Sequence, residues 1–204
     1  MLTVNGDRDA VETQLAGGEL ECPLCSGLLT GWGTAVPRRV RQLAGDDGQV
    51  RGEVVTPRRS RCRGCGATHV LLPVQCLLRR ADAAAVIGTA LEKNAAGAGH
   101  RKIARVLGRP AATVRGWLRR FTVRAEPVRA FFTVLLAVTS PDPVMPAAAR
   151  GAVADAVSAV AGAAAAVAER WPQIGEVPVW AAASAASGGR LLAPGWPAPA
   201  CNAS

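Results

Sequence analysis

The chain has 204 residues, of which 24 are lysine or arginine and 15 are aspartate or glutamate, giving a formal net charge of +9. Half of the residues are hydrophobic, which excludes wholesale disorder, and only 19% are charged, which argues against a solvated coiled coil. This length allows one or two compact units. The excess of positive charge favours a polyanionic partner.

The N-terminal segment is acidic and carries no export signal. Residues 1–21 contain five acids and a single base, Arg8, whereas a signal peptide has a basic head followed by an apolar run. We expect residues 1–20 to be disordered and the protein to be cytoplasmic. In a reducing compartment, paired cysteines are expected to bind metal or to act as redox groups before they form disulfides.

Residues 21–73 are predicted to form a small β-domain with a metal site. Glycine-rich turns separate short strand-like runs, which are residues 28–30, 36–43, 53–56 and 68–72, with the clearest turn at residues 45–48. Two C-x-x-C pairs lie in this region with 36 residues between them, and they comprise Cys22, Cys25, Cys62 and Cys65. Zn²⁺ prefers four such soft ligands in a tetrahedron, and a four-cysteine shell leaves no position for a catalytic water. This pattern predicts a zinc ribbon with one structural ion.

The alternative interpretation is two unrelated pairs of buried or redox-active cysteines. His69 lies four residues after Cys65 and is surplus to a four-cysteine site, so we expect a strand or surface histidine there. Cys76 is expected to pack in the first helix, and neither it nor Cys201 is assigned a role.

Residues 74–126 show helical periodicity and are predicted to form a helix-turn-helix domain. The three expected helices are residues 75–94, 99–107 and 110–122. Gly108 stands where a left-handed turn residue would end the second helix, and Pro110 opens the third. The third segment carries apolar residues at i, i+3, i+4 and i+7, one stripe of a helix, formed by Val114, Trp117, Leu118 and Phe121.

The same region is strongly basic, which indicates double-stranded DNA as the partner. Residues 101–129 contain nine bases and one acid. A recognition helix reads base edges in the major groove, where arginine binds guanine with two hydrogen bonds, so we expect Arg115 and Arg119 to read bases. The residues expected to contact phosphate or to set the register on the backbone are Thr113, Arg120, Arg101, Lys102, Arg105 and Arg109. The alternative is a basic helical hairpin with no ligand.

The C-terminal third is divided into an apolar helical region, residues 127–170, and a tail rich in proline and glycine, residues 171–204. No membrane span is expected, because residues 131–138 are too short to cross a bilayer and charged residues interrupt residues 147–168. The helical region is expected to pack on the domain or on a second copy, as a homodimer would double the DNA site. The tryptophans expected to fix the tail are Trp171, Trp180 and Trp196.

Three stretches of the sequence carry a resemblance to a known family: Cys22-x-x-Cys25, the run from Cys62 to Pro73, and residues 101–120. Together they resemble an actinobacterial family of uncharacterised helix-turn-helix proteins with an N-terminal zinc ribbon. The layout is similar to the N-terminal DNA-binding regions of transposases. The resemblance covers residues 20–125 and implies DNA binding, in a mobile-element setting, without supplying an enzymatic activity.

These observations predict an α+β protein that binds DNA in a sequence-specific way without catalysis, as a nucleoid-associated transcriptional regulator or a mobile-element accessory factor. One alternative is a truncated or degenerate transposase or recombinase. The five acids after the predicted helix-turn-helix stand in poor surroundings for a two-metal site, so no enzymatic activity is expected. A further alternative is a redox-sensing regulator in which oxidation of the cysteines ejects zinc and releases DNA.

Overall fold

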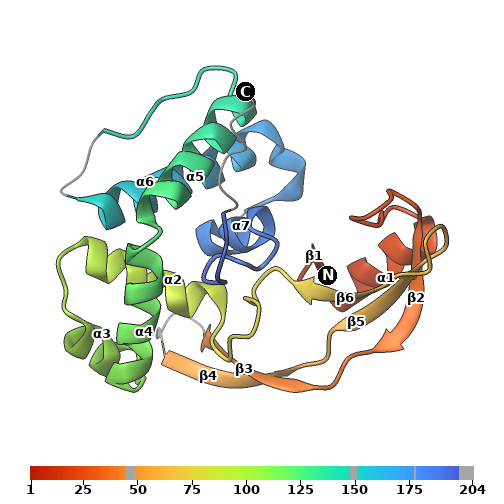
Figure 1. Ribbon diagram of the computed structural model, residues 1–204, viewed down its shortest axis with the longest axis horizontal. Helices are drawn as coiled ribbons and strands as arrows, with labels where there is room; N and C mark the ends of the chain where they lie inside the picture. The colour runs from red at the N-terminus through yellow and green to blue at the C-terminus, as the bar shows by residue number, and fades with distance from the viewer. Residues whose placement is uncertain (45–48, 148–150, 177, 198–204) are drawn as a thin grey trace.

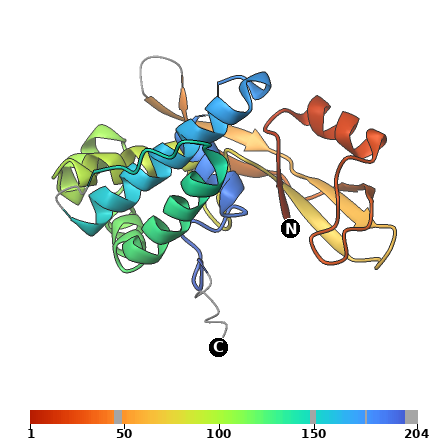
Figure 2. The same ribbon diagram turned by 90° about the horizontal axis from the view of Figure 1, so that it is seen from above.

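Most strands lie in the first 73 residues and most helices follow them, so the chain has the mixed α and β structure expected from its sequence. The computed structural model describes residues 1–44, 49–147, 151–176 and 178–197. Figure 1 shows most of the helices on one side and, on the other, a four-stranded sheet, called the main sheet below, with helix α1 (Arg8–Gly17). Figure 2 shows the same division from above. The predicted turn at residues 45–48 lies outside the described residues.

The strands form two small sheets. The first has four strands in the order β1-β6-β5-β2, with β1 parallel to β6 and the other pairs antiparallel. Its strands are β1 (Leu2–Val4), β2 (Leu29–Thr34), β5 (Arg58–Cys62) and β6 (Thr68–Pro73). The second sheet is a hairpin of β3 (Arg38–Ala44) and β4 (Gln49–Val55), which reaches toward the helices (Figure 1). Strand β5 was not expected, because its arginine-rich sequence masks the burial of Ser60 and Cys62.

The expectation of a disordered N-terminus is wrong. Residues 1–20 contain β1 and helix α1 (Arg8–Gly17). The Asp7 side chain caps α1 by accepting a hydrogen bond of 3.0 Å from the Asp9 backbone N–H. Val11 and Leu15, one helical turn apart, are buried in a small hydrophobic core that α1 shares with the main sheet. The acidic composition of this segment concealed that apolar pair.

Three helices follow the strands: α2 (Ala84–Ala95), α3 (His100–Val106) and α4 (Ala111–Thr122). The first begins nine residues later than the expected start at residue 75, because the preceding backbone forms turns and bonds to distant segments. The Leu78 N–H, for example, donates to the Gly189 carbonyl at 2.7 Å. Cys76 is buried, as expected, but it lies in this loop rather than in the helix.

Helix α5 (Ala125–Thr139) and helix α6 (Ala152–Arg170) lie side by side (Figure 1). Among the described residues, α6 is the one helix long and apolar enough to cross a membrane by length and composition. Its Ala156, Val160 and Ala163 are buried, and the helix packs on α5, α2 and α7 (Val179–Ala186). One side of α6 is thus buried in the hydrophobic core.

Part of the predicted proline- and glycine-rich tail, residues 171–204, is helical. It contains a short 3₁₀ helix, η1 (Pro172–Ile174), and helix α7 (Val179–Ala186). Trp180 packs on Gly88 of α2 so closely that a methyl group at residue 88 would overlap its ring, and its Nε1–H donates to Glu92 Oε1 at 2.7 Å. Trp196 is also buried, whereas Trp171 is 40% exposed.

Candidate metal centre and nucleic-acid interface

The structure brings the four cysteines of the two C-x-x-C pairs together, as the sequence predicted. Their Sγ atoms all lie within 4.8 Å of one another. Cys22 Sγ is 3.8 Å from Cys65 Sγ, and Cys25 Sγ is 3.5 Å from Cys62 Sγ. A sulfur tetrahedron around a metal with bonds of about 2.3 Å has edges of about 3.8 Å, whereas a disulfide would need about 2.05 Å. The cluster therefore has the spacing of a closed four-ligand metal site.

The two cysteine turns have the same backbone construction. In the first, the Ser26 N–H donates to the Cys22 carbonyl at 2.9 Å, and in the second the Gly66 N–H donates to the Cys62 carbonyl at 3.1 Å. Both donor residues have positive φ, 55° for Ser26 and 71° for Gly66. Gly27 supplies the close approach between the turns, since a Cβ there would lie 3.0 Å from Cys62 Sγ. The small residues of these turns are thus set by the geometry of the cluster.

Hydrogen bonds within the cluster and burial shift the pKa values of Cys62 and Cys65 in opposite directions. The Cys65 N–H donates to Cys62 Sγ at 3.5 Å and is the main cause that lowers the pKa of Cys62 to about 6. The Ala67 amide lowers the pKa of Cys65, but the Cys25 thiol, burial and the remaining thiols together raise it to about 11. Thiols this close resist a second negative charge, and a bound cation would remove that conflict.

His69 lies on β6, as expected for a strand histidine, but it is buried rather than on the surface. Its Nε2 is 3.3 Å from Cys22 Sγ, and its Nδ1 accepts a hydrogen bond of 3.1 Å from the Met1 amino group. Burial lowers the pKa of His69, and the positive charge on Met1 lowers it further. A neutral imidazole with its proton on Nε2 would donate to the Cys22 thiolate. Sequence reasoning missed this partner of the cluster, although its position four residues after Cys65 was a signal.

Replacing His69 with alanine is expected to weaken metal binding by roughly 10- to 100-fold, the usual cost of losing a hydrogen bond to a metal ligand. The measurement is a competition between the purified protein and a chromogenic chelator. His100→Ala is the matched control, because His100 begins α3 and does not contact the cysteines. Equal metal affinity in the two variants would remove His69 from the site.

Helices α3 and α4 form the basic helical pair that the sequence predicted. Gly108 follows α3 with φ +59°, which confirms the left-handed residue expected there. The helices pack through Ile103 and Leu107 on one side and Val114 and Trp117 on the other, all of them buried. Trp117 is 3% exposed. The apolar stripe of α4 thus faces the core and leaves its other side to solvent.

Most residues predicted to contact DNA lie on the exposed surface of this pair. The exposed ones are Arg101, Lys102, Arg105, Arg115, Arg119 and Arg120, and Thr113 is half-buried. Arg120 also donates to the Gly116 carbonyl at 3.0 Å. Arg109 differs from the others, because its Nε lies 2.8 Å from Asp82 Oδ1 and its side chain is largely buried. The ion pair with Asp82, 27 positions earlier in the chain, gives Arg109 a structural role that its own sequence neighbourhood does not reveal.

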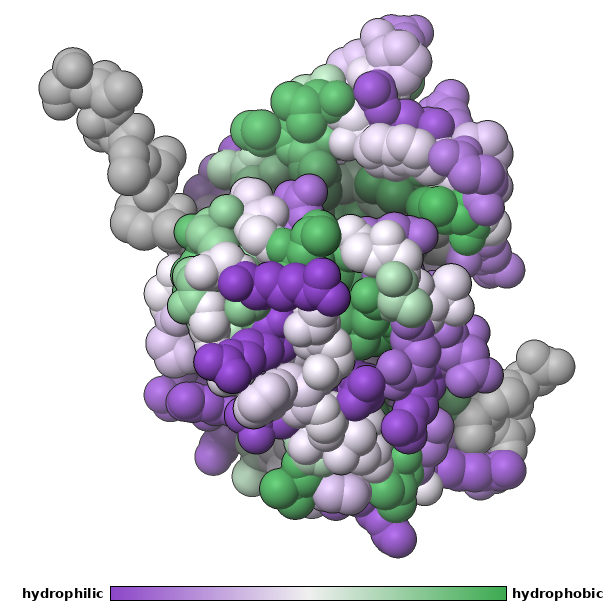
Figure 3. Space-filling model, turned by 90° about the vertical axis from the view of Figure 1, so that its right-hand side faces the viewer, coloured by the Kyte–Doolittle hydropathy of each residue, from purple (hydrophilic) through white to green (hydrophobic). Residues whose placement is uncertain are grey.

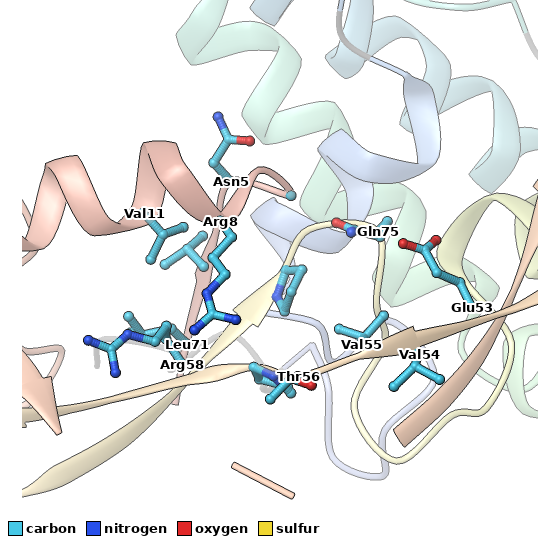
Figure 4. A pocket seen from close by; sticks show the side chains of 14 residues that line it. Asn5, Arg8, Val11, Glu53, Val54, Val55, Thr56, Arg58, Leu71 and Gln75 are labelled. Atoms are coloured by element: carbon cyan, nitrogen blue, oxygen red, sulfur yellow. The ribbon is translucent and has the colours of Figure 1, made fainter. Parts of the chain in front are cut away.

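A separate pocket of about 230 Å³ lies between the N-terminal segment and the strands β4 and β5. Figure 4 shows Arg8 and Asn5 from the N-terminal segment and Glu53 from β4 around it. None of the residues predicted to bind metal or DNA lines this pocket. Figure 3 views the α1 end of the molecule, where hydrophilic and hydrophobic residues are mixed across the surface.

Among the described residues, the four cysteines are the one group of three or more histidine, cysteine, aspartate or glutamate side chains close enough to share a metal ion. Comparisons with protein-family models, with curated proteins and with solved structures found no match to this chain. Its function is therefore inferred from two features, the four-cysteine cluster and the basic helical pair of α3 and α4.

Proposed function

We propose that the protein binds double-stranded DNA in a sequence-specific way, without catalysis, as a transcriptional regulator or a mobile-element accessory factor in the cytoplasm. In this proposal α3 and α4 form a helix-turn-helix, and α4 enters the major groove. The four cysteines bind one structural Zn²⁺ in a zinc ribbon that supports the main sheet.

The orientation of α4 is the observation that carries the proposal. Arg115 and Arg119 are exposed one helical turn apart, while Trp117 on the opposite side is buried in the core. A recognition helix needs this arrangement, because its apolar side must hold it on the domain while its other side reaches the bases. An arginine that is free to extend can bind guanine O6 and N7 together. The exposed bases of α3 would then lie along the phosphate backbone.

The choice of zinc is supported by the donor set. Four thiolates in a tetrahedral arrangement favour Zn²⁺ or iron in a protein, and hard cations such as Mg²⁺ prefer oxygen ligands. The main sheet has a small core, seven buried residues that include Cys22 and Cys62 themselves. A core of this size gains from a metal crosslink. Zinc would act here as a structural element that holds β2 and β5 together.

A second copy of the chain is part of the proposal. One helix-turn-helix contacts only a few base pairs, so two copies would double the length of the site. Helix α5 leaves Val134 and Val138 exposed one turn apart on its surface. These side chains would contribute to a contact between copies through the C-terminal helical region.

The Arg115→Ala variant tests the recognition helix. It is expected to relax the preference at one base pair, at a cost of about 1–3 kcal/mol on the preferred sequence. The preferred sequence is found by selection from random duplexes with the wild-type protein, and affinities are then measured at a fixed salt concentration. Arg101→Ala, on α3, is the comparison and should weaken binding to all duplexes equally. If Arg115→Ala selects the same sites with unchanged affinity, α4 is not the recognition helix.

A further inference from the structure

The β3–β4 hairpin borders the basic helical pair and forms a groove with it. The groove holds about 440 Å³ and runs between the hairpin and the turn that joins α3 to α4. Four arginines line it: Arg39 and Arg41 from β3, Arg105 from α3 and Arg109 from the turn. None of the described residues that line it is acidic. Segments more than 60 positions apart in the sequence thus contribute to one basic surface.

A buried carboxylate fixes the hairpin to the turn. The Asp82 side chain is 6% exposed and lies between Arg109 Nε, at 2.8 Å, and Arg41 Nη1, at 4.0 Å. The backbone adds two hydrogen bonds of 2.8 Å: the Arg41 N–H donates to the Ala81 carbonyl, and the Ala83 N–H donates to the Arg41 carbonyl. The hairpin therefore has a fixed position relative to the α3–α4 turn.

The core holds the base of the hairpin as well. Val40 and Val55 belong to the same hydrophobic core as α2 and α4, and β3 packs on α2. A two-stranded hairpin alone is marginally stable in water, so these contacts give it a defined shape. A rigid basic hairpin can contact a ligand without a large loss of conformational entropy.

Two of the four arginines are available to a ligand. Arg39 and Arg105 are exposed. Within residues 1–44, 49–147, 151–176 and 178–197, no hydrogen bond or ion pair occupies the guanidinium of either one. Asp82 balances only one of the four positive charges around the groove. Such an uncompensated basic groove attracts an extended polyanion.

We propose that the β3–β4 hairpin is a second DNA-contacting element, and that Arg39 and Arg105 bind phosphates of the backbone beside the major groove that α4 enters. This inference rests on the proposed function. The occupant is duplex DNA, because the groove adjoins the turn from which α4 begins, and a helix in the major groove brings the flanking backbone close to its N-terminal end. The hairpin would set the register of α4 without reading bases.

The test uses the full chain and measures how affinity depends on salt. Each phosphate neutralised by a protein cation contributes about 0.9 to the slope of log affinity against log salt concentration. Arg39→Gln and Arg105→Gln should each reduce the slope by about 1, and the double variant by about 2, with the selected sequence unchanged. Arg39→Lys should keep the slope, since it retains the charge.

Arg8→Gln is the matched control, because Arg8 is exposed at the start of α1, and Figure 1 shows α1 at the opposite end of the molecule from α3. Circular dichroism establishes that each variant is folded. If Arg39→Gln shows the slope of the control, the hairpin does not contact DNA, whatever the slope of Arg105→Gln, because Arg105 lies on α3. That result would not contradict the recognition helix, provided that Arg115→Ala changes the base preference. If the wild-type protein binds no duplex at all, the proposed function itself is wrong.

Discussion

Replacing Cys62 with serine is expected to abolish metal binding and to unfold the cysteine end of the main sheet. The Cys62 side chain is buried at the end of β5, and its Sγ has the other three sulfurs within 4.8 Å. A serine hydroxyl is a poor replacement for a thiolate and leaves an incomplete shell. In small zinc domains the metal supplies about 10–16 kcal/mol of folding free energy. The measurements are the metal content of the purified protein and hydrogen exchange across residues 21–73.

Cys76→Ala is the control for the cysteine variant. Cys76 is buried in the large core that contains the helices, and burial raises the pKa of its thiol. This variant should keep the wild-type metal content. The Cys62→Ser variant should also keep most of its helical signal, because α2 to α7 pack in the large core, whereas Cys22 and Cys62 belong to the small core at the other end of the sheet. Normal metal content in Cys62→Ser would show that the cluster is not a four-cysteine site.

Replacing Trp180 with alanine is expected to lower the free energy of unfolding by about 3–5 kcal/mol, the cost of removing a large buried aromatic side chain. The Trp180 ring fills the space above Gly88, and its Nε1–H bonds to Glu92 at 2.7 Å. The variant leaves a cavity between α2 and α7. The measurement is urea unfolding followed by circular dichroism.

Two further variants separate the causes of this loss. Trp180→Phe keeps an aromatic ring but removes the hydrogen bond to Glu92. We expect the loss of this bond to lower the free energy of unfolding by about 1 kcal/mol, in addition to the effect of the smaller side chain. Trp171→Ala should change stability by less than about 0.5 kcal/mol, because Trp171 is a surface residue. If the Trp171→Ala and Trp180→Ala variants lose the same free energy of unfolding, the packing of α7 on α2 does not stabilise the fold.

The parts of the structure that depend on local sequence were the predictable ones. The two C-x-x-C turns and the turn at Gly108 need particular residues at fixed spacing, so a sequence reveals them. The apolar stripe of α4 was visible for the same reason. The cysteines themselves could be assigned to one cluster because two such turns suit one ion.

The features that escaped prediction depend on distant partners. Arg109 resembles its basic neighbours, and only the fold brings Asp82 to its side chain. His69 contacts Cys22 across 47 positions of the chain. The C-terminal segment, with its glycines and prolines, looked like a loose tail because its burial comes from surfaces on α2 and the first sheet rather than from any periodicity of its own.

The packing of Trp180 on Gly88 has a consequence for folding during synthesis and for the choice of shorter fragments. All candidate metal ligands and DNA contacts precede residue 127, which invites a shorter version for work with DNA. Such a fragment would expose the apolar side of α2, because α6 and α7 cover it. During synthesis on the ribosome, that side is fully covered only after both α6 and α7 have emerged. A chain truncated at residue 126 would keep the apolar side of α2 exposed, which favours aggregation.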